Sequence, residues 1–97
     1  MIVIRHAIFR GRVQGVGFRA FVEDEAAQHG VEGWVRNRRD GTVEAVFTGE
    51  APVVENMIAA CRKGGYASRV DGMDVREASA DELARRGGNK FAVLPTV

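Results

Sequence analysis

The sequence predicts an α+β protein with the split βαβ, ferredoxin-like fold. In this fold two helices pack on one face of an antiparallel sheet in the order β-α-β-β-α-β, and here one extra terminal strand follows. Two observations predict it. Apolar residues alternate at a period of two in some segments and recur at a period near 3.6 in others. Glycines, or an Asp-Gly pair, separate these segments, as is typical of turns.

The N-terminal third is predicted to hold a strand and then a helix. Residues 3–13 alternate between an apolar and a polar face, which indicates a strand with one buried face. The buried face consists of Ala7, Phe9 and Val13, and the other face of His6, Arg10 and Arg12. From Phe18 the apolar residues recur at i, i+3, i+4 and i+8, which predicts an amphipathic helix that ends at Gly30.

The middle of the chain is predicted to be a hairpin followed by a second helix. Residues 31–37 and 42–48 form the two strands, because Asp40-Gly41 is a strong turn signal between them. Pro52 suits the first turn of the helix, and Gly64-Gly65 ends it. The apolar face of this helix consists of Val53, Val54, Met57, Ile58 and Cys61.

Two further strands are predicted toward the C-terminus. Val70, Met73 and Val75 suggest a fourth strand, although a glycine at position 72 weakens that prediction. Phe91–Val97 is predicted to be the last strand. Pro95 places this strand at an edge of the sheet, because proline lacks the N–H that a central strand donates.

The composition excludes several classes of function. Fourteen basic and thirteen acidic residues give a net charge of +1, too even for the broad positive field of a general nucleic-acid-binding protein. Residues 42–47 lack the aromatic pattern of an RNA-binding sheet. No apolar run approaches membrane-spanning length, and a single cysteine excludes an intramolecular disulfide. We therefore expect one cytoplasmic domain over residues 1–97, with neither nucleic acid nor membrane as a partner.

The segment Gly11–Arg19 has the features of an anion-binding turn. A strand runs into glycines at positions 15 and 17 and then into the start of a helix. Glycines let backbone N–H groups converge, and a helix N-terminus adds partial positive charge. Arg19 lies in the first helical turn, where its planar guanidinium group could bind two phosphate oxygens at once.

The predicted topology brings Asn37 to the same place. In a right-handed β-α-β crossover the two strands are parallel, so their C-terminal ends lie at one edge of the sheet. The glycine turn follows the first strand and Asn37 ends the second, so Arg19 and Asn37 are expected at one rim. Taken singly, an arginine in a first helical turn is usually a solvated side chain, and an asparagine before a hairpin is most often a turn residue; it is their pairing beside the glycine turn that makes anion chemistry an equal alternative.

The other motifs in the sequence are weaker indications of function. Gly15–Ala20 matches the dinucleotide pattern G-x-G-x-x-A, but a single β-α-β unit cannot build the doubly wound sheet that binds dinucleotides. Cys61 lies on an apolar helix face and is predicted to be a core residue. His6 and His29 are isolated, and no cluster has the spacing of metal ligands, so we expect no metal and no cofactor.

Trp34 and the arginines after it are interpreted separately. Trp34 is more typical of a packed strand residue than of one that stacks on a ligand. Arg36, Arg38 and Arg39 either steer anions toward the rim or keep the turn soluble, and the sequence leaves both interpretations open.

Three stretches together resemble the signature of the acylphosphatase family: Gly11–Arg19, Gly33–Asn37 and Asp40–Val43. The resemblance implies hydrolysis of acyl phosphates, which are carboxylic–phosphoric anhydrides, with inorganic phosphate as product and competitor. Phe91–Val97 departs from the usual family pattern of a polar strand that ends in an aromatic residue, which leaves the packing of that strand open.

The resemblance also implies which residues do the chemistry. In this family the turn after the first strand binds the phosphate, here through the backbone of Gly15, Val16, Gly17 and Phe18. Arg19 would hold the phosphate and Asn37 would orient the attacking water. Since an acyl phosphate loses a carboxylate, a good leaving group, positioning and charge stabilisation suffice without a cofactor.

One alternative function remains. Similar domains form the start of carbamoyl-transferring hydrogenase maturation proteins, where carbamoyl phosphate is the ligand. A non-catalytic acyl or carbamoyl phosphate-binding module of that kind would need a separate partner chain. The residues favour the enzyme, which we expect to be a monomer that acts on a small-molecule acyl phosphate.

Overall fold

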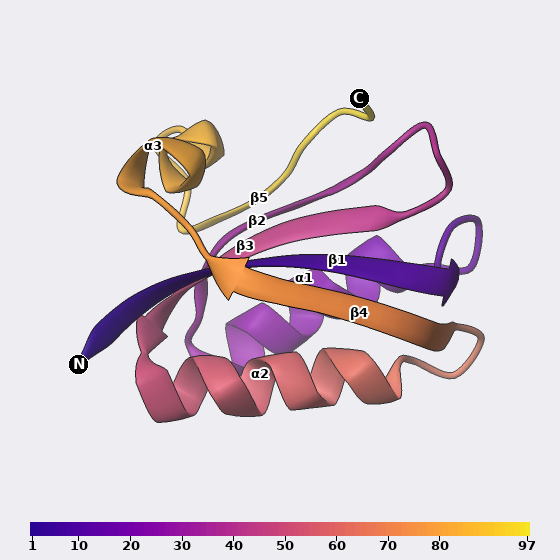
Figure 1. Cartoon of the computed structure of the whole chain (residues 1–97), viewed down its shortest axis with the longest axis horizontal. Coiled ribbons are helices and arrows are strands. Elements are labelled where there is room, and N and C mark those ends of the chain that lie inside the picture. The colour runs from indigo at the N-terminus through magenta and orange to yellow at the C-terminus, as the bar shows by residue number, and fades with distance from the viewer.

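The computed structural model describes residues 1–97 (Figure 1). Its elements are β1 (Ile2–Arg12), α1 (Phe18–His29), β2 (Glu32–Asn37), β3 (Val43–Glu50), α2 (Ala51–Lys63), β4 (Arg69–Glu77), α3 (Ala80–Leu83), the 3-10 helix η1 (Ala84–Arg86) and β5 (Phe91–Val93). The predicted β-α-β-β-α-β order is confirmed. Strand β4 continues through the glycine at position 72, but its pairing with β1 shifts there: Arg10 pairs with Gly72 and Gly11 with Val70, so Asp71 of β4 is an extra residue in the ladder.

The five strands form one sheet in the order β4-β1-β3-β2-β5. The first four pair antiparallel, as predicted, and the terminal strand β5 pairs parallel to β2, so the complete sheet is mixed. The reason lies in the connection. The chain leaves β4 at one edge, crosses to the opposite edge through α3 and η1, and enters β5 in the direction of β2.

Both long helices cover the same face of the sheet (Figure 1), as predicted. The main core lies between them and the sheet, and it includes Phe9 and Val35 from the strands and Phe18, Val22 and Met57 from the helices. Glycines end both helices where the sequence predicts. Gly30 at the C-terminus of α1 has a φ of 69° and donates its N–H to the last helical carbonyls, a conformation that other residues adopt with strain.

Helix α3 lies over part of the other face of the sheet (Figure 1). A small apolar cluster around Trp34 packs on that face, and Leu83 of α3 contacts it. His6 was expected on an exposed polar face, yet only 7% of it is exposed. Its Nε2 lies 2.7 Å from Glu44 Oε2, and the Nε of Arg36 donates to the other carboxylate oxygen at 2.7 Å. Burial raises the pKa of Glu44, but hydrogen bonds and positive charge from His6 and Arg36 outweigh it and leave the pKa below its usual value.

The prediction for the last strand was too long. Strand β5 ends at Val93, two residues before Pro95. The tail still follows β2, since Leu94 N donates to Val35 O at 2.9 Å and Val97 N donates to Asn37 O at 3.2 Å.

Helix α3 was not anticipated from the hydrophobic pattern. A local signal does precede it, because Ser79 and Glu82 form a capping box in which each side chain accepts from the backbone N–H of the other.

Candidate anion-binding site

The turn between β1 and α1 depends on two glycines. Gly15 has a φ of 71° and Gly17 a φ of 78°, both in the left-handed region where side chains with a Cβ are strained. Gly17 is also the N-cap of α1 and supplies no side-chain cap. The two glycines therefore reverse the chain and leave the start of the helix uncapped.

A run of backbone N–H groups lines this turn without backbone partners. No N–H of residues 15–17 donates to a carbonyl, and the first α1 bond runs from Phe21 N to Gly17 O at 3.0 Å. The N–H groups of the first helical turn have no intrahelical acceptor by geometry. Phe18 anchors the run, because its buried ring packs edge-on against Phe9 with the centroids 5.3 Å apart. Together these groups form a fixed cradle of donors at the positive end of a helix dipole.

Arg19 projects from the first turn of α1 and has no protein partner. It forms neither a hydrogen bond nor an ion pair, although Glu23 lies one helical turn further on. A cation near a helix N-terminus is electrostatically unfavourable, in the range of 0.3–1 kcal/mol, by roughly the amount that an anion there is favourable. The local sequence thus places a free guanidinium group where it lowers stability, which is typical of a site for an anionic ligand.

Asn37 lies at the same edge of the sheet, as the topology predicted. Val43 of β3 is in register with both Phe9 of β1 and Asn37 of β2, so the C-terminal ends of β1 and β2 lie side by side across β3. Since side chains alternate along a strand, Asn37 shares the helix-covered face with Val35. The Oδ1 of Asn37 is buried and has no hydrogen-bond partner in the protein, a state that native proteins usually avoid.

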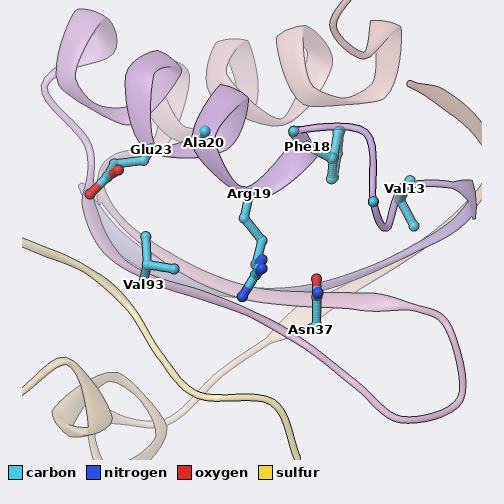
Figure 2. Close-up of a pocket in the computed structure, with 9 residues that line it drawn as sticks. Val13, Phe18, Arg19, Ala20, Glu23, Asn37 and Val93 are labelled. Atoms are coloured by element: carbon cyan, nitrogen blue, oxygen red, sulfur yellow. The ribbon is translucent and has the colours of Figure 1, made fainter. Parts of the chain in front are cut away.

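A cavity of about 490 Å³ joins these features. Figure 2 shows Arg19 reaching down from α1 and Asn37 rising from β2 into the same space. The lining residues are Val13, Gly15, Gly17, Phe18, Arg19, Ala20, Glu23, Asn37 and Val93. The structure therefore brings together every predicted site residue except Val16, whose side chain packs against the core and leaves only its backbone at the turn.

Four lining residues were not predicted from the sequence. Three of them could have been inferred from the predicted position of Arg19, because they lie within one turn of the glycine loop or of the helix start: Val13, Ala20 and Glu23. Val93 belongs to β5, and no local pattern indicated that this strand would pair beside β2.

Among the three arginines that follow Trp34 in sequence, the structure shows what Arg36 contacts. The guanidinium of Arg36 lies 4.7 Å from the centre of the Trp34 ring and binds Glu44, on the sheet face opposite the cavity. Arg36 is therefore a structural residue. Trp34 is a packed residue, as predicted: it is 1% exposed, and its Nε1 donates to Glu82 O at 2.7 Å.

Other reactive groups lie outside this site. Burial raises the pKa of the Cys61 thiol to about 12, so this core cysteine is not a thiolate at neutral pH. No group of three or more His, Cys, Asp and Glu side chains is arranged to hold a metal ion. No helix of the structure has the length and apolar character needed to cross a membrane.

The fold and the site define a class of protein: a small ferredoxin-like α+β domain with a cavity at the start of its first helix, lined by Arg19, Asn37 and unpaired backbone N–H groups. Comparison with known proteins gives the family. The acylphosphatase family model matches residues 5–92. An acylphosphatase from Bradyrhizobium diazoefficiens is 58% identical over 95 residues, which are 97% of this chain and 96% of the relative. The chain belongs to the acylphosphatase family, and it is a hydrolase that acts on acyl phosphates.

Solved structures agree with this assignment. The crystal structure of acylphosphatase from Bacillus subtilis is similar, with a TM-score of 0.83 and 36% identity, covering 97% of this chain and 99% of that one. Full-length HypF, in a phosphate- and nucleotide-bound form, also matches with a TM-score of 0.83 and 28% identity. The match covers 99% of this chain but 12% of HypF, so there the similar domain is a small part of a longer protein.

Proposed function

We propose that Arg19 and Asn37 carry the acyl phosphate hydrolysis of this protein, with Arg19 binding the phosphate and Asn37 holding the attacking water. One observation supports this proposal above the others. Two polar side chains that have no protein partner meet in one cavity, beside a run of backbone N–H groups that are likewise unpaired.

The phosphate of the substrate lies in the turn. Backbone N–H groups from Gly15 to Phe18 donate to its oxygens, and the guanidinium of Arg19 covers them from the side. Because these donors are already oriented, negative charge that develops on the equatorial oxygens during transfer is stabilised without reorganisation of the protein.

The amide of Asn37 holds water on the side of the phosphorus opposite the acyl oxygen. The water oxygen forms the new P–O bond while the bond to the acyl oxygen breaks, and the electron pair leaves with the carboxylate. A phosphate oxygen takes the proton of the water. Since a carboxylate needs no strong acid to leave, the reaction proceeds by positioning and charge stabilisation.

The acyl group lies toward the other end of the cavity. Figure 2 shows Val93 and Glu23 on the side of Arg19 away from Val13 and Phe18. Ala20 adds a small wall on the same side. An apolar acyl chain fits against Ala20 and Val93, with the exposed carboxylate of Glu23 at the mouth.

The likeness to HypF supports one other function, a non-catalytic module that binds an acyl or carbamoyl phosphate. Coverage favours the enzyme, because the match spans nearly all of the acylphosphatases and only 12% of HypF. A turnover assay separates the two functions, since a binding module holds its ligand without releasing phosphate continuously.

The first test is hydrolysis of benzoyl phosphate in the presence of EDTA. We expect continuous release of benzoate and phosphate at a rate that the chelator leaves unchanged, with little activity on an ordinary phosphate monoester, whose poor leaving group needs an acid or a metal ion. A rate that falls in EDTA and recovers on addition of a divalent ion would contradict the proposed mechanism.

Inorganic phosphate is expected to compete with the substrate. The cradle and Arg19 recognise a tetrahedral anion, whether or not it carries an acyl group. Phosphate should therefore raise the apparent KM and leave kcat unchanged in steady-state kinetics. Inhibition that lowers kcat at constant KM would place the phosphate site elsewhere.

We also propose that the protein is a cytoplasmic monomer whose residues 1–97 form one domain. The free, buried Cys61 suits a reducing compartment. The main core draws on all elements from β1 to α2. Arg19, Asn37 and the cradle belong to the same chain, so the proposed chemistry needs no residue from a second copy.

A further inference from the structure

We infer that Gln14 is a positioning residue that holds Asn37 in place relative to the phosphate cradle. This inference rests on the proposed roles of Arg19 and Asn37. Gln14 is half-buried, and its Nε2 donates two hydrogen bonds: to Arg38 O at 2.7 Å and to Thr42 O at 2.8 Å. Both hydrogens of one side-chain amide are thus used on two backbone carbonyls.

These two bonds connect the two halves of the site. Gln14 directly precedes Gly15, the first residue of the cradle, and Arg38 directly follows Asn37. The hairpin loop is itself closed by Arg38 N, which donates to Thr42 O at 2.9 Å. A shift of the loop therefore moves Asn37 and both acceptors of Gln14 together.

No other hydrogen bond links the two loops. Strand β3 separates β1 from β2, and its pairing with both strands ends at Val43. Beyond that residue, the only hydrogen bonds between residues 13–17 and residues 38–42 are the two from Gln14. At this edge the direct hydrogen bonding between cradle and hairpin therefore comes from a single side chain.

The cradle and the hairpin have different roles in the proposed reaction, so a shift between them affects binding and turnover differently. Phosphate binding needs the cradle and Arg19, which belong to one continuous segment. The water attacks in line only if Asn37 keeps its position relative to that segment, and a displacement of about 1 Å in such a geometry can lower a rate by about a hundredfold. Loss of the Gln14 bonds is therefore expected to lower kcat while phosphate affinity persists.

The test is Gln14→Met, which keeps the size and shape of the side chain and removes both donors. Gln28→Met is the control, because Gln28 is exposed on α1 and makes no side-chain hydrogen bond. For Gln14→Met we expect kcat to fall about tenfold or more, with an inhibition constant for inorganic phosphate within about twofold of the wild type. The control should match the wild type in both. Should Gln14→Met melt below the assay temperature, Gln14→Asn replaces it, since its amide is too short to reach the carbonyls.

A double-mutant cycle with Asn37→Ala shows whether Gln14 acts through Asn37. If it does, Gln14→Met lowers kcat in the wild type and has little further effect when Asn37 is alanine. Two outcomes overturn the inference about Gln14 and leave the proposed function intact. One is that Gln14→Met lowers kcat as much in the Asn37→Ala protein as in the wild type. The other is that the inhibition constant for phosphate rises by the same factor as kcat falls. A wild-type kcat for Asn37→Ala by itself removes Asn37 from the mechanism, and the role of Gln14 with it.

Discussion

Arg19→Ala is expected to lower kcat by about a hundredfold or more and to raise KM, in a protein that stays folded. The guanidinium contacts the phosphate in the bound substrate and again in the transition state, so its loss weakens both binding and turnover. Losing one preorganised charged donor from such a site corresponds to about 3 kcal/mol. The measurement is kcat and KM on benzoyl phosphate with purified variant and wild type.

The stability of the same variant gives an independent check. Because Arg19 is a cation at a helix N-terminus and has no ion-pair partner, its removal should leave the free energy of unfolding unchanged or raise it by about 0.3–1 kcal/mol. Arg62→Ala is the matched control, because Arg62 is exposed in the last turn of α2, where a cation is favourable. It should keep wild-type kinetics and lose a little stability.

Phosphate provides a readout without turnover. It should raise the melting temperature of the wild type, since a ligand that binds only the native state stabilises it by mass action. The shift should shrink strongly in Arg19→Ala. A variant with unchanged kinetics and an unchanged phosphate shift would show that Arg19 is a solvated surface residue.

Asn37→Ala is expected to lower kcat by about a hundredfold and to change KM little. Its proposed partner is water and not the phosphate, so the loss falls on the step in which water attacks. The fold should be retained, because the side chain makes no hydrogen bond and its buried Oδ1 has no partner to lose. Circular dichroism and the phosphate inhibition constant, both near wild type, check that the cradle is intact.

Asn56→Ala serves as the control for the removal of an asparagine amide, since Asn56 is exposed on α2. A kcat near the wild-type value in folded Asn37→Ala would return Asn37 to the role of an ordinary hairpin residue. A large rise in KM with normal kcat would instead make it a phosphate ligand.

Local sequence was sufficient for the elements from β1 to β4 and for half of the site. Glycines at positions 15, 17 and 30 mark places where the backbone needs a left-handed conformation, and that need acts within a few residues of the chain. The helix period that starts at Phe18 places Arg19 beside the glycine turn for the same reason. Asn37 required one further step, the parallel arrangement of the strands in a β-α-β unit, which is a general rule and not a property of this sequence.

Tertiary structure alone decided the rest. The pairing of β5 with β2 brings Val93 into the cavity, and the two bonds of Gln14 join loops that lie 24 and 28 residues apart in sequence. His6 and Arg36 alternate with apolar residues as exposed side chains do, yet both bind Glu44 on a face that α3 helps to cover. Periodicity and turn preferences report the conformation of neighbouring residues. Which distant segments meet depends on the free energy of the whole packed chain, so contacts of this kind leave no local pattern to detect.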